Sequence, residues 1–546
     1  MRRLLLSLAL GQAICGAQPF IYLHAVSNAA SSLPFGIPAG TIAQGSIFSI
    51  YGRNIGPATG VQASSFPLSN TLGNVSVTVT DGITMLNAIP IYVSASQVNA
   101  IMPSNAPTGT VSVRVAVNNA RSNSVPVRVG TNSLGLFTVR GTGAGPGVIF
   151  NFVSQANQPL NSLQTPAKPG QIVTLWGTGL GPVPADNVQP TAGNLPVTVE
   201  VLVGGAAAAT SYSGRSPCCA GDDQIVFQVP QSSPTGCWVP VSVRLAGTVV
   251  SNTVTMAITS DGSSCVANAS KPAKAFIQGG TVGLLAPLRS DIAQAAPNDP
   301  LNLRGDFLVA RFGQEKGGTF AFNPLVALPP AGTCTAYAGS GDWFTTANLP
   351  NLAPEVKALD AGGGTVSGGS KSATYGAPFS PLTLGFLGAS NPANPSKSDT
   401  SLLAPGSFNV QIAGGADVPS FKMPFTMISP VTWTNQDQIS TVDRSSGFTV
   451  TWSGGAGQTI AVVGGNVDLP NNASGIFVCM AAPGASSITV PPLVLSNLPP
   501  GRGNPHYSKG TVFLVAGGTV NTFATGGVSQ GLLVPIYVSG KAVAVK

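Results

Sequence analysis

The sequence has few charged and few acid-base side chains. Only 8% of its 546 residues are Asp, Glu, Lys or Arg, against roughly 25% in an average soluble protein. It contains two histidines, His24 and His506, and three glutamates. The formal net charge is +7, but the basic residues are scattered along the chain. Because nucleic-acid binding needs a basic stripe or patch, we expect no nucleic-acid partner.

The residues of a hydrolase active site are also missing. Serine and cysteine hydrolases need a base beside the nucleophile, usually histidine. One Gly-x-Ser-x-Gly match surrounds Ser529, but a strand-like run follows it and no histidine comes later. We interpret this match as a turn. His24 lies in a region that we expect to fray, and His506 lies in a glycine-containing loop without a second metal ligand. The sequence predicts no catalytic residue, no cofactor and no metal site, so we expect a protein that is not an enzyme.

No long hydrophobic run follows residue 17, so we expect no transmembrane segment after signal cleavage. Residues 1–17 have two arginines, an apolar stretch and small residues, which is typical of a secretory signal peptide. We expect the mature chain to begin at Gln18. A lipid anchor on Cys15 is the alternative, but Ile14 stands where a small residue is needed.

The six cysteines beyond the signal peptide favour disulfides in an exported protein. A bond between the adjacent residues Cys218 and Cys219 would close a strained ring, so we expect each to pair with Cys237 or Cys265. Free buried thiols are the alternative, and the adjacency disfavours a zinc site. The disulfide candidates are Cys218, Cys219, Cys237, Cys265, Cys334 and Cys479.

What the chain does contain favours β-structure. It has 67 Gly, 46 Pro and 43% apolar residues, and abundant Val and Thr favour strands and tight turns. One segment occurs twice, because GSIFSIYGRNIGP at 45–57 returns as GQIVTLWGTGLGP at 170–182. Glycines, alternating apolar positions and the final Gly-Pro are shared, so folding requirements explain the repeat.

Further segments extend the duplication. Val75–Val79 aligns with Val197–Val201, and residues 97–103 align with 224–230. Residues 122–125 align with 251–254, and the offset drifts between segments. Insertions thus fall between strands, as in two homologous domains with variable loops. Each unit has short alternating strands separated by turn residues, which predicts an immunoglobulin-like β-sandwich.

These segments carry a family resemblance. Ile47–Pro57, Tyr92–Asn99, Thr165–Gly170, Trp176–Pro182 and Ser251–Val254 resemble an uncharacterised secreted domain abundant in acidobacterial proteomes. That domain is itself similar to the IPT/TIG immunoglobulin-like modules. The resemblance covers about residues 24–265 and implies exported modules used for structure or contact. The family has no established activity to carry over.

The fold class that we predict is all-β, with tandem immunoglobulin-like β-sandwiches followed by further β-sandwich domains. Residues 268–300 are rich in Ala, Pro and Asn and are interpreted as a linker. The predicted division is the signal peptide at 1–17, immunoglobulin-like domains at 18–135 and 136–265, a β-rich domain at 266–426 and a β-sandwich at 427–546.

Aromatic residues are mostly assigned to packing. Tyr51 and Trp176 occupy equivalent strand positions, and we expect them in the cores, with sugar stacking as the alternative. Trp452 is expected to pack likewise, and Trp238 to cover a disulfide. The candidate contact residues are Trp343 and Phe344.

Carboxylates are the residues on which the alternative of an enzyme depends. The adjacent pair Asp222 and Asp223 is interpreted as a solvated loop tip, with a calcium site as the alternative. A glycosidase needs two facing carboxylates. The unfamiliar third domain holds several acidic residues that could form such a pair: Asp299, Asp306, Glu315, Asp342 and Glu355.

The leading hypothesis is an exported, non-catalytic multi-domain β-protein with a structural or adhesive role at the cell surface or outside the cell. Its partner would be an unknown extracellular glycan or protein, contacted mostly through loops. The alternative is a secreted enzyme with an active site in residues 270–430 and the immunoglobulin-like repeats as accessory modules. A passive matrix component without a specific ligand is a third hypothesis.

Overall fold

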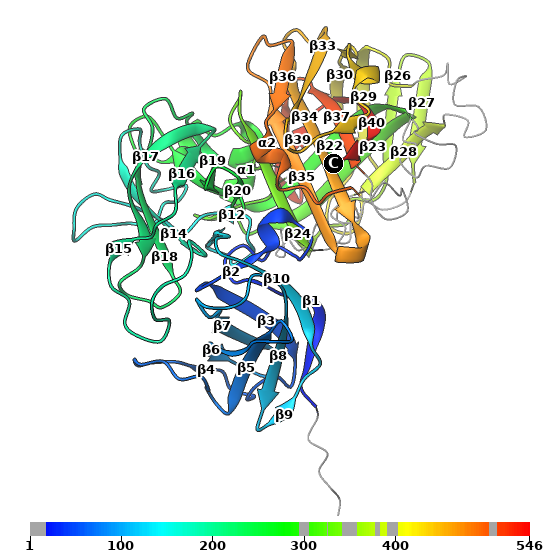
Figure 1. Cartoon of the computed structure of the whole chain (residues 1–546). Helices are drawn as coiled ribbons and strands as arrows, with labels where there is room; N and C mark the ends of the chain where they lie inside the picture. The colour runs from blue at the N-terminus through cyan, green and yellow to red at the C-terminus, as the bar shows by residue number, and fades with distance from the viewer. Residues whose placement is uncertain are drawn as a thin grey trace, which may run out of the picture.

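The computed structural model describes residues 18–293, 305–324, 326–340, 357–376, 383–389, 402–501 and 510–546 (Figure 1). These residues are almost entirely strands and turns, which confirms the all-β prediction. No helix in the described ranges is long and apolar enough to cross a bilayer. The predicted signal peptide lies outside the described residues.

Residues 20–130 form the first sandwich. Strand β6 pairs with β7 in one layer and with β5 in the other, so the path runs β1-β3-β7-β6 and then β5-β8-β10-β2. Because successive side chains of a strand point to opposite faces, Phe48 and Ile50 meet Val77 and Val113 in one core. The strands are β1 (Phe20–Asn28), β2 (Ile42–Ala43), β3 (Ile47–Arg53), β4 (Val61–Gln62), β5 (Val75–Thr80), β6 (Met85–Val93), β7 (Gln97–Ile101), β8 (Gly109–Val117), β9 (Ala120–Arg121) and β10 (Val125–Gly130).

Residues 135–258 repeat this architecture. The order β11-β14-β18-β17-β16-β19-β21-β12 matches the first sandwich position by position. In both units the last two strands of the path, β10 with β2 and β21 with β12, pair in parallel. The structure thus confirms the tandem repeat. The strands are β11 (Gly135–Leu136), β12 (Gly145–Pro146), β13 (Ile149–Asn151), β14 (Ile172–Thr178), β15 (Gly193–Asn194), β16 (Val199–Val203), β17 (Ala206–Arg215), β18 (Asp223–Gln228), β19 (Gly236–Leu245), β20 (Val249–Val250) and β21 (Val254–Ile258).

One part of the repeat alignment is wrong by two residues. We aligned Val79 with Val201, but Val79 is equivalent to Val203, because their strand partners Val113 and Val241 occupy the same place in β8 and β19. A slide of two residues keeps every apolar side chain on the same face of the strand. The alternating pattern alone therefore could not detect the error.

The C-terminal body is built on one large sheet. Among the described residues it has twelve strands, with the path β24-β35-β34-β37-β40-β22-β23-β25. A four-stranded sheet covers β22 and β23 around Leu308 and Phe408. A three-stranded sheet covers β34 and β37 around Trp452 and Leu514, so Trp452 packs in a core as predicted.

The strands of the large sheet are β22 (Gly280–Ala293), β23 (Gly305–Glu315), β24 (Cys334–Ser340), β25 (Lys357–Ala358), β28 (Thr383–Ala389), β32 (Thr441–Val442), β34 (Thr459–Asp468), β35 (Ala473–Met480), β37 (Gly510–Gly517), β38 (Asn521–Thr525), β39 (Val528–Leu533) and β40 (Ile536–Val545). The smaller sheets hold β26 (Gly364–Gly368), β27 (Lys371–Tyr375), β29 (Gly406–Ile412) and β30 (Phe421–Met427), and β31 (Thr432–Trp433), β33 (Phe448–Ser453) and β36 (Ser487–Val490).

Strands from both sides of the predicted boundary at 426 share this large sheet. β24 pairs with β35, and β22 runs parallel to β40. Cys334 and Cys479 are cross-strand partners and form a disulfide. Strand pairing and this disulfide thus join the segments before and after residue 426. The division into a third and a fourth domain stays a prediction.

The predicted linker at 268–300 is wrong for its described part. Helix α1 (Lys271–Gln278) is capped by Ser270, whose hydroxyl accepts a hydrogen bond from the Ala273 amide, and it ends at Gly279 with φ +72°. Strand β22 follows and pairs with β23 from Gly280 to Ser290. The Ala and Pro content suggested a linker, but long-range pairing makes this segment a central strand.

The three bodies pack side by side (Figure 1). A short 3-10 helix of the first sandwich, η1 (Pro38–Gly40), and the segment before it contact β24 and β35. Leu33, Ile37 and Ala39 form an apolar cluster there with Ala338 and Ala473. The second sandwich meets the C-terminal body around Trp238 and Phe322. The remaining helical turns are η2 (Cys265–Asn268), η5 (Gln436–Gln438), η6 (Leu469–Asn471) and α2 (Pro492–Leu495).

Candidate functional site

A buried ion pair holds the two sandwiches together. The Arg215 guanidinium lies 2.5 Å from Asp223, and the two side chains are 5% and 0% exposed. Arg215 also donates to the Gly45 carbonyl of the first sandwich at 2.7 Å and to the Gly181 carbonyl at 2.9 Å. The guanidinium therefore links the two copies of the repeated segment, 45–57 and 170–182.

Asp223 has its other oxygen satisfied by backbone. The amides of Gly179 and Leu180 donate to it at 2.6 and 2.7 Å. Burial raises the pKa of Asp223, while Arg215 and these amides oppose that shift. Nearby, Thr178 donates to the Gly221 carbonyl and accepts from the Ile47 amide, again across the two units. The junction is a dense polar network without solvent-exposed groups.

The prediction of a solvated loop tip at Asp222 and Asp223 is wrong. The Asp223 side chain is fully buried and Asp222 is half-buried, and burial together with the charge of Asp223 raises the pKa of Asp222 to about 7. No group of three metal-ligating side chains gathers anywhere in the described ranges. Asp223 therefore acts in the junction, where Arg215 and two amides bind it.

The prediction that Cys218 and Cys219 each pair with Cys237 or Cys265 is also wrong. These adjacent residues bond to each other, and Cys237 bonds to Cys265. The reason is the position of the two pairs in the sandwich. Strand β18, six residues long, separates them, and such a strand spans roughly 20 Å, so the pairs lie at opposite ends of the unit.

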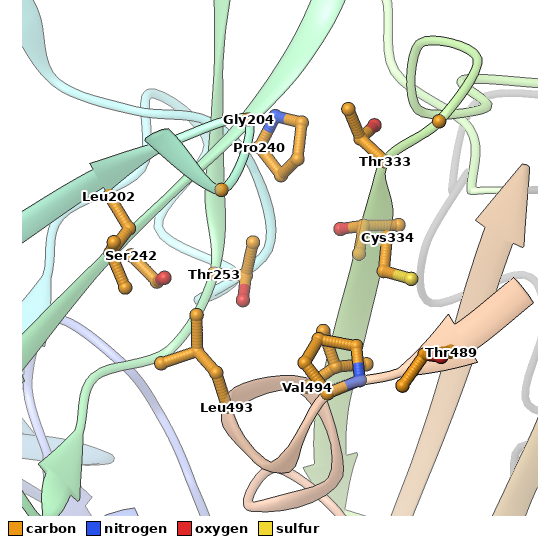
Figure 2. A pocket seen from close by; sticks show the side chains of 14 residues that line it. Leu202, Gly204, Pro240, Ser242, Thr253, Thr333, Cys334, Thr489, Leu493 and Val494 are labelled. Carbon is orange, nitrogen blue, oxygen red and sulfur yellow. The ribbon is translucent and has the colours of Figure 1, made fainter. Parts of the chain in front are cut away.

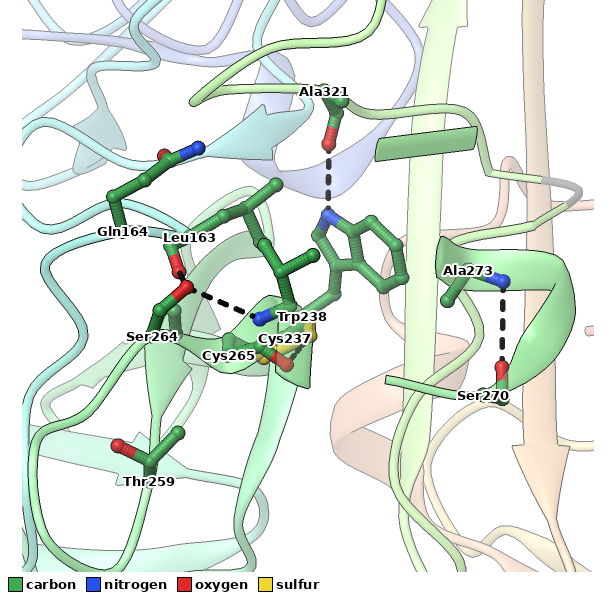
Figure 3. The surroundings of a disulfide bond; sticks show 12 residues. Leu163, Gln164, Cys237, Trp238, Thr259, Ser264, Cys265, Ser270, Ala273 and Ala321 are labelled. Carbon is green, nitrogen blue, oxygen red and sulfur yellow. Dashed lines mark hydrogen bonds between the residues drawn. A yellow bond between two sulfur atoms is a disulfide. The ribbon is translucent and has the colours of Figure 1, made fainter. Parts of the chain in front are cut away.

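Trp238 lies beside the disulfide between Cys237 and Cys265, as predicted (Figure 3). Its indole N–H donates to the Ala321 carbonyl at 3.0 Å. Because Ala321 belongs to the C-terminal body, this tryptophan both packs on the disulfide and joins two bodies.

Several predicted site residues lie outside the described residues. These are the contact candidates Trp343 and Phe344, together with Asp299, Asp342, Glu355 and His506. The described acids Asp306 and Glu315 lie at opposite ends of β23, about 30 Å apart at the usual rise of a strand. Glu315 pairs with Arg311 at 2.8 Å. Asp306 and Glu315 therefore do not form the facing pair of a glycosidase.

Ser529 has a structural role in the sheet. It lies in β39, and its hydroxyl donates to the Thr281 carbonyl at 3.0 Å while its amide donates to the Thr281 hydroxyl. The glycine turn at Gly527 precedes it with φ +80°. This agrees with the interpretation of the motif as a turn before a strand.

The predicted core position of Tyr51 is wrong, and so is the frayed position of His24. Tyr51 is 41% exposed on β3, and His24 lies inside the paired strand β1 with a positive φ of 59°. The alternation of β3 explains Tyr51, because Phe48 and Ile50 point into the core and Ser49 and Tyr51 therefore point outward. This alternation was visible in the sequence.

An aromatic and polar surface surrounds Tyr51, and we name it the Tyr51 face. The Arg53 guanidinium lies 4.9 Å from the centre of the Phe20 ring, and Phe20 meets Tyr22 edge to face at 6.2 Å. Gln97 is the cross-strand partner of Tyr51. The face consists of the exposed residues Phe20, Tyr22, Tyr51 and Arg53, the half-buried amides Gln97 and Asn99, and the buried Ser49 that hydrogen-bonds to Asn99.

A cavity of about 160 Å³ lies between the second sandwich and the C-terminal body (Figure 2). Leu202 and Pro240 face Leu493 and Val494 across it, and its hydroxyls include Ser242. Its lining has no charged side chain. Pockets for drug-sized ligands hold about 300–1,000 Å³, so this space suits a few water molecules.

Comparisons with known proteins give only distant structural similarity. No family model matches the chain, and no curated protein matches it in sequence. It is similar to the tetra-tandem repeat of the extending region of a large adhesion protein, with 9% identity, 95% of this chain and 98% of that chain covered, and a TM-score of 0.13.

Two further solved structures are similar to the same degree. SGBP-B from a xyloglucan utilization locus in Bacteroides uniformis has 12% identity, with 75% of this chain and 86% of that chain covered and a TM-score of 0.15. Domains 4–9 of the surface layer protein SbsC have 11% identity, with 97% and 66% covered and a TM-score of 0.17. At such low TM-scores these likenesses assign no function to this chain.

Proposed function

We propose that this chain is an exported, non-catalytic multi-domain β-protein with a structural or adhesive role at the cell surface or outside the cell. Its partner would be a glycan or a protein. The observation that carries the proposal is the Tyr51 face, where exposed aromatic rings lie on an otherwise polar sheet surface. Soluble proteins rarely leave such clusters exposed without an interaction to make.

The junction supports the structural half of the proposal. Arg215 and Asp223 fix the first sandwich against the second, and the first sandwich also packs on the C-terminal body through Leu33 and Ile37. Such an arrangement holds the Tyr51 face in a constant orientation. A rigid scaffold that presents a contact surface is what a structural or adhesive protein needs.

Export is supported by the cysteines and by the leader. All six cysteines beyond residue 17 are in disulfides, and disulfides persist in oxidising compartments outside the cytosol. The pattern of residues 1–17 is that of a signal peptide. Membership of the acidobacterial domain family and kinship with IPT/TIG modules belong to the same proposal.

The test has two parts. Fractionation of expressing cells and N-terminal sequencing should find a mature chain beginning at Gln18 outside the cytoplasm. An array of polysaccharides and envelope proteins should capture this mature chain, and Tyr51→Ala should reduce the capture. A chain retained in the cytoplasm with free thiols would refute export. Capture that is indifferent to Tyr51 would refute this face as the contact surface.

A further inference from the structure

The edge strand beside Tyr51 is interrupted at one place. On β1, Ile21 pairs with Gly52 and Val26 pairs with Ile50, so residues 22–25 lie opposite the single residue Tyr51. Bulges of this kind re-aim side chains and are common beside functional sites. The strained φ of His24 belongs to this bulge, and residues with such φ values cluster where a site requires them. Tyr22 is the first residue of the bulge, is 46% exposed and meets the Phe20 ring.

The second sandwich interrupts its edge strand at the equivalent place. Leu136 pairs with Gly177 and Ile149 pairs with Leu175, so residues 137–148 lie opposite Trp176. Here the longer insertion contributes β12, and the Trp176 ring is only partly exposed and has a buried indole N–H. The shorter bulge of the first sandwich leaves Tyr51 open.

The residue at the position of Arg53 also differs between the repeats, being exposed in the first and buried in the second. Its counterpart is Thr178, which is fully buried and hydrogen-bonded across the junction. Arg53 instead lies on the open face, with one side of its guanidinium on the Phe20 ring. No carboxylate in the described part of the chain forms an ion pair with it. Its N–H groups are available to a carboxylate from outside.

Polar groups complete the face. Asn99 accepts hydrogen bonds from Ser49 at 3.0 Å and from Gln97 at 2.9 Å. These bonds orient the two amides, and within the described ranges the Asn99 amide nitrogen and the Gln97 amide oxygen have no hydrogen-bond partner in the protein. One donor and one acceptor thus lie beside the Tyr51 ring, in the arrangement that sugar hydroxyls can use.

The charge of the face selects among glycans. The seven residues of the Tyr51 face include one cation, Arg53, and no acidic residue, and the whole chain is formally +7. Tyr51 and Arg53 are two residues apart on one face of β3, or about 7 Å. That spacing suits one sugar ring on Tyr51 with its exocyclic carboxylate at Arg53.

We propose that the Tyr51 face binds an acidic, uronate-bearing polysaccharide. A pyranose ring stacks on Tyr51, a carboxylate makes a two-pronged contact with Arg53, and hydroxyls bind Gln97 and Asn99. The inference rests on the proposed contact function and names its ligand class.

The test uses the full mature chain and affinity electrophoresis in gels containing polygalacturonate. A matched neutral polymer, made by reducing the carboxyl groups of polygalacturonate, separates charge recognition from sugar stacking. We expect Arg53→Gln to weaken binding to the acidic polymer about tenfold or more and to leave any binding to the neutral polymer unchanged. Tyr51→Ala should weaken binding to both polymers.

Phe152→Ala is the matched control, because Phe152 is a comparably exposed aromatic residue, at 42%, on the second sandwich. It should bind like the unaltered chain, and circular dichroism should show that all variants are folded. Equal retention on both polymers with no effect of Arg53→Gln would overturn the acidic ligand class while leaving the contact function in place. Absence of binding to either polymer would also overturn this inference, and the array of envelope proteins would then decide the contact function separately.

Discussion

Replacing Arg215 by methionine should loosen the junction between the two sandwiches. The substitution keeps much of the apolar volume but leaves the Asp223 carboxylate buried at 0% exposure without its cation. Removing one partner of a buried ion pair typically costs about 3–5 kcal/mol. The amides of Gly179 and Leu180 still bind the carboxylate, so we expect the lower part of that range.

The assay is amide hydrogen exchange on the full chain, because exchange reports local opening where several bodies unfold separately. About 3 kcal/mol corresponds to roughly a hundredfold faster exchange. The increase should be concentrated in residues 178–182 and 215–223. Arg244→Ala is the matched control, because the Arg244–Glu200 pair is 38% and 37% exposed and exposed pairs contribute about 0–1 kcal/mol.

The effect should also depend on pH. In Arg215→Met the pKa of Asp223, already raised by burial, rises further because the opposing cation is gone. A raised folded-state pKa means that the folded chain holds its proton longer than the unfolded chain, so stability falls as pH rises above the unfolded value. Destabilisation should therefore be small near pH 4 and large at neutral pH. Equal, pH-independent effects of Arg215→Met and Arg244→Ala would refute the role of the junction.

Two further predictions concern the same region. Asp222, with its pKa raised to about 7, should lower stability by up to about 1.4 kcal/mol per pH unit between its unfolded pKa and pH 7. Denaturant titrations should show a smaller slope in Asp222→Asn, where only the raised pKa of Asp223 still contributes at this site. An unchanged slope in Asp222→Asn would contradict the raised pKa of Asp222. Replacing both Cys237 and Cys265 by serine should destabilise the second sandwich by about 2–5 kcal/mol and shift tryptophan emission to the red. The bond between the adjacent residues Cys218 and Cys219 closes no chain loop. The double variant Cys218→Ser, Cys219→Ser should therefore unfold nearly like the parent. An equal loss of stability in the two double variants would contradict the assigned disulfide pairing.

The strands of the two repeats were predictable because their signals are local. Alternating apolar residues and glycine turns specify a strand and its ends, and the repeated segment at 45–57 and 170–182 occupies β3 and β14 in equivalent positions. The same alternation contained the outward direction of Tyr51. An aromatic residue in an apolar strand usually indicates packing in the core, and this indication conflicts with the alternation at Tyr51.

The features that were not predictable depend on contacts between distant segments. Strand β22 looked like a linker because its partners, β23 and β40, lie elsewhere in the chain. Asp223 looked solvated because its cation, Arg215, and the two amides that bind it meet only in the folded junction. The bond between Cys218 and Cys219 followed from the length of β18, which keeps them away from the other disulfide.

The most direct test of the account is a hydrogen-exchange footprint of the full chain with and without bound polysaccharide, with assay of the supernatant for released sugar. The account predicts protection in residues 20–26, 48–53 and 97–99, with no sugar released. Protection centred on residues 305–315, or release of reducing sugar, would contradict a non-catalytic contact protein that binds through the Tyr51 face.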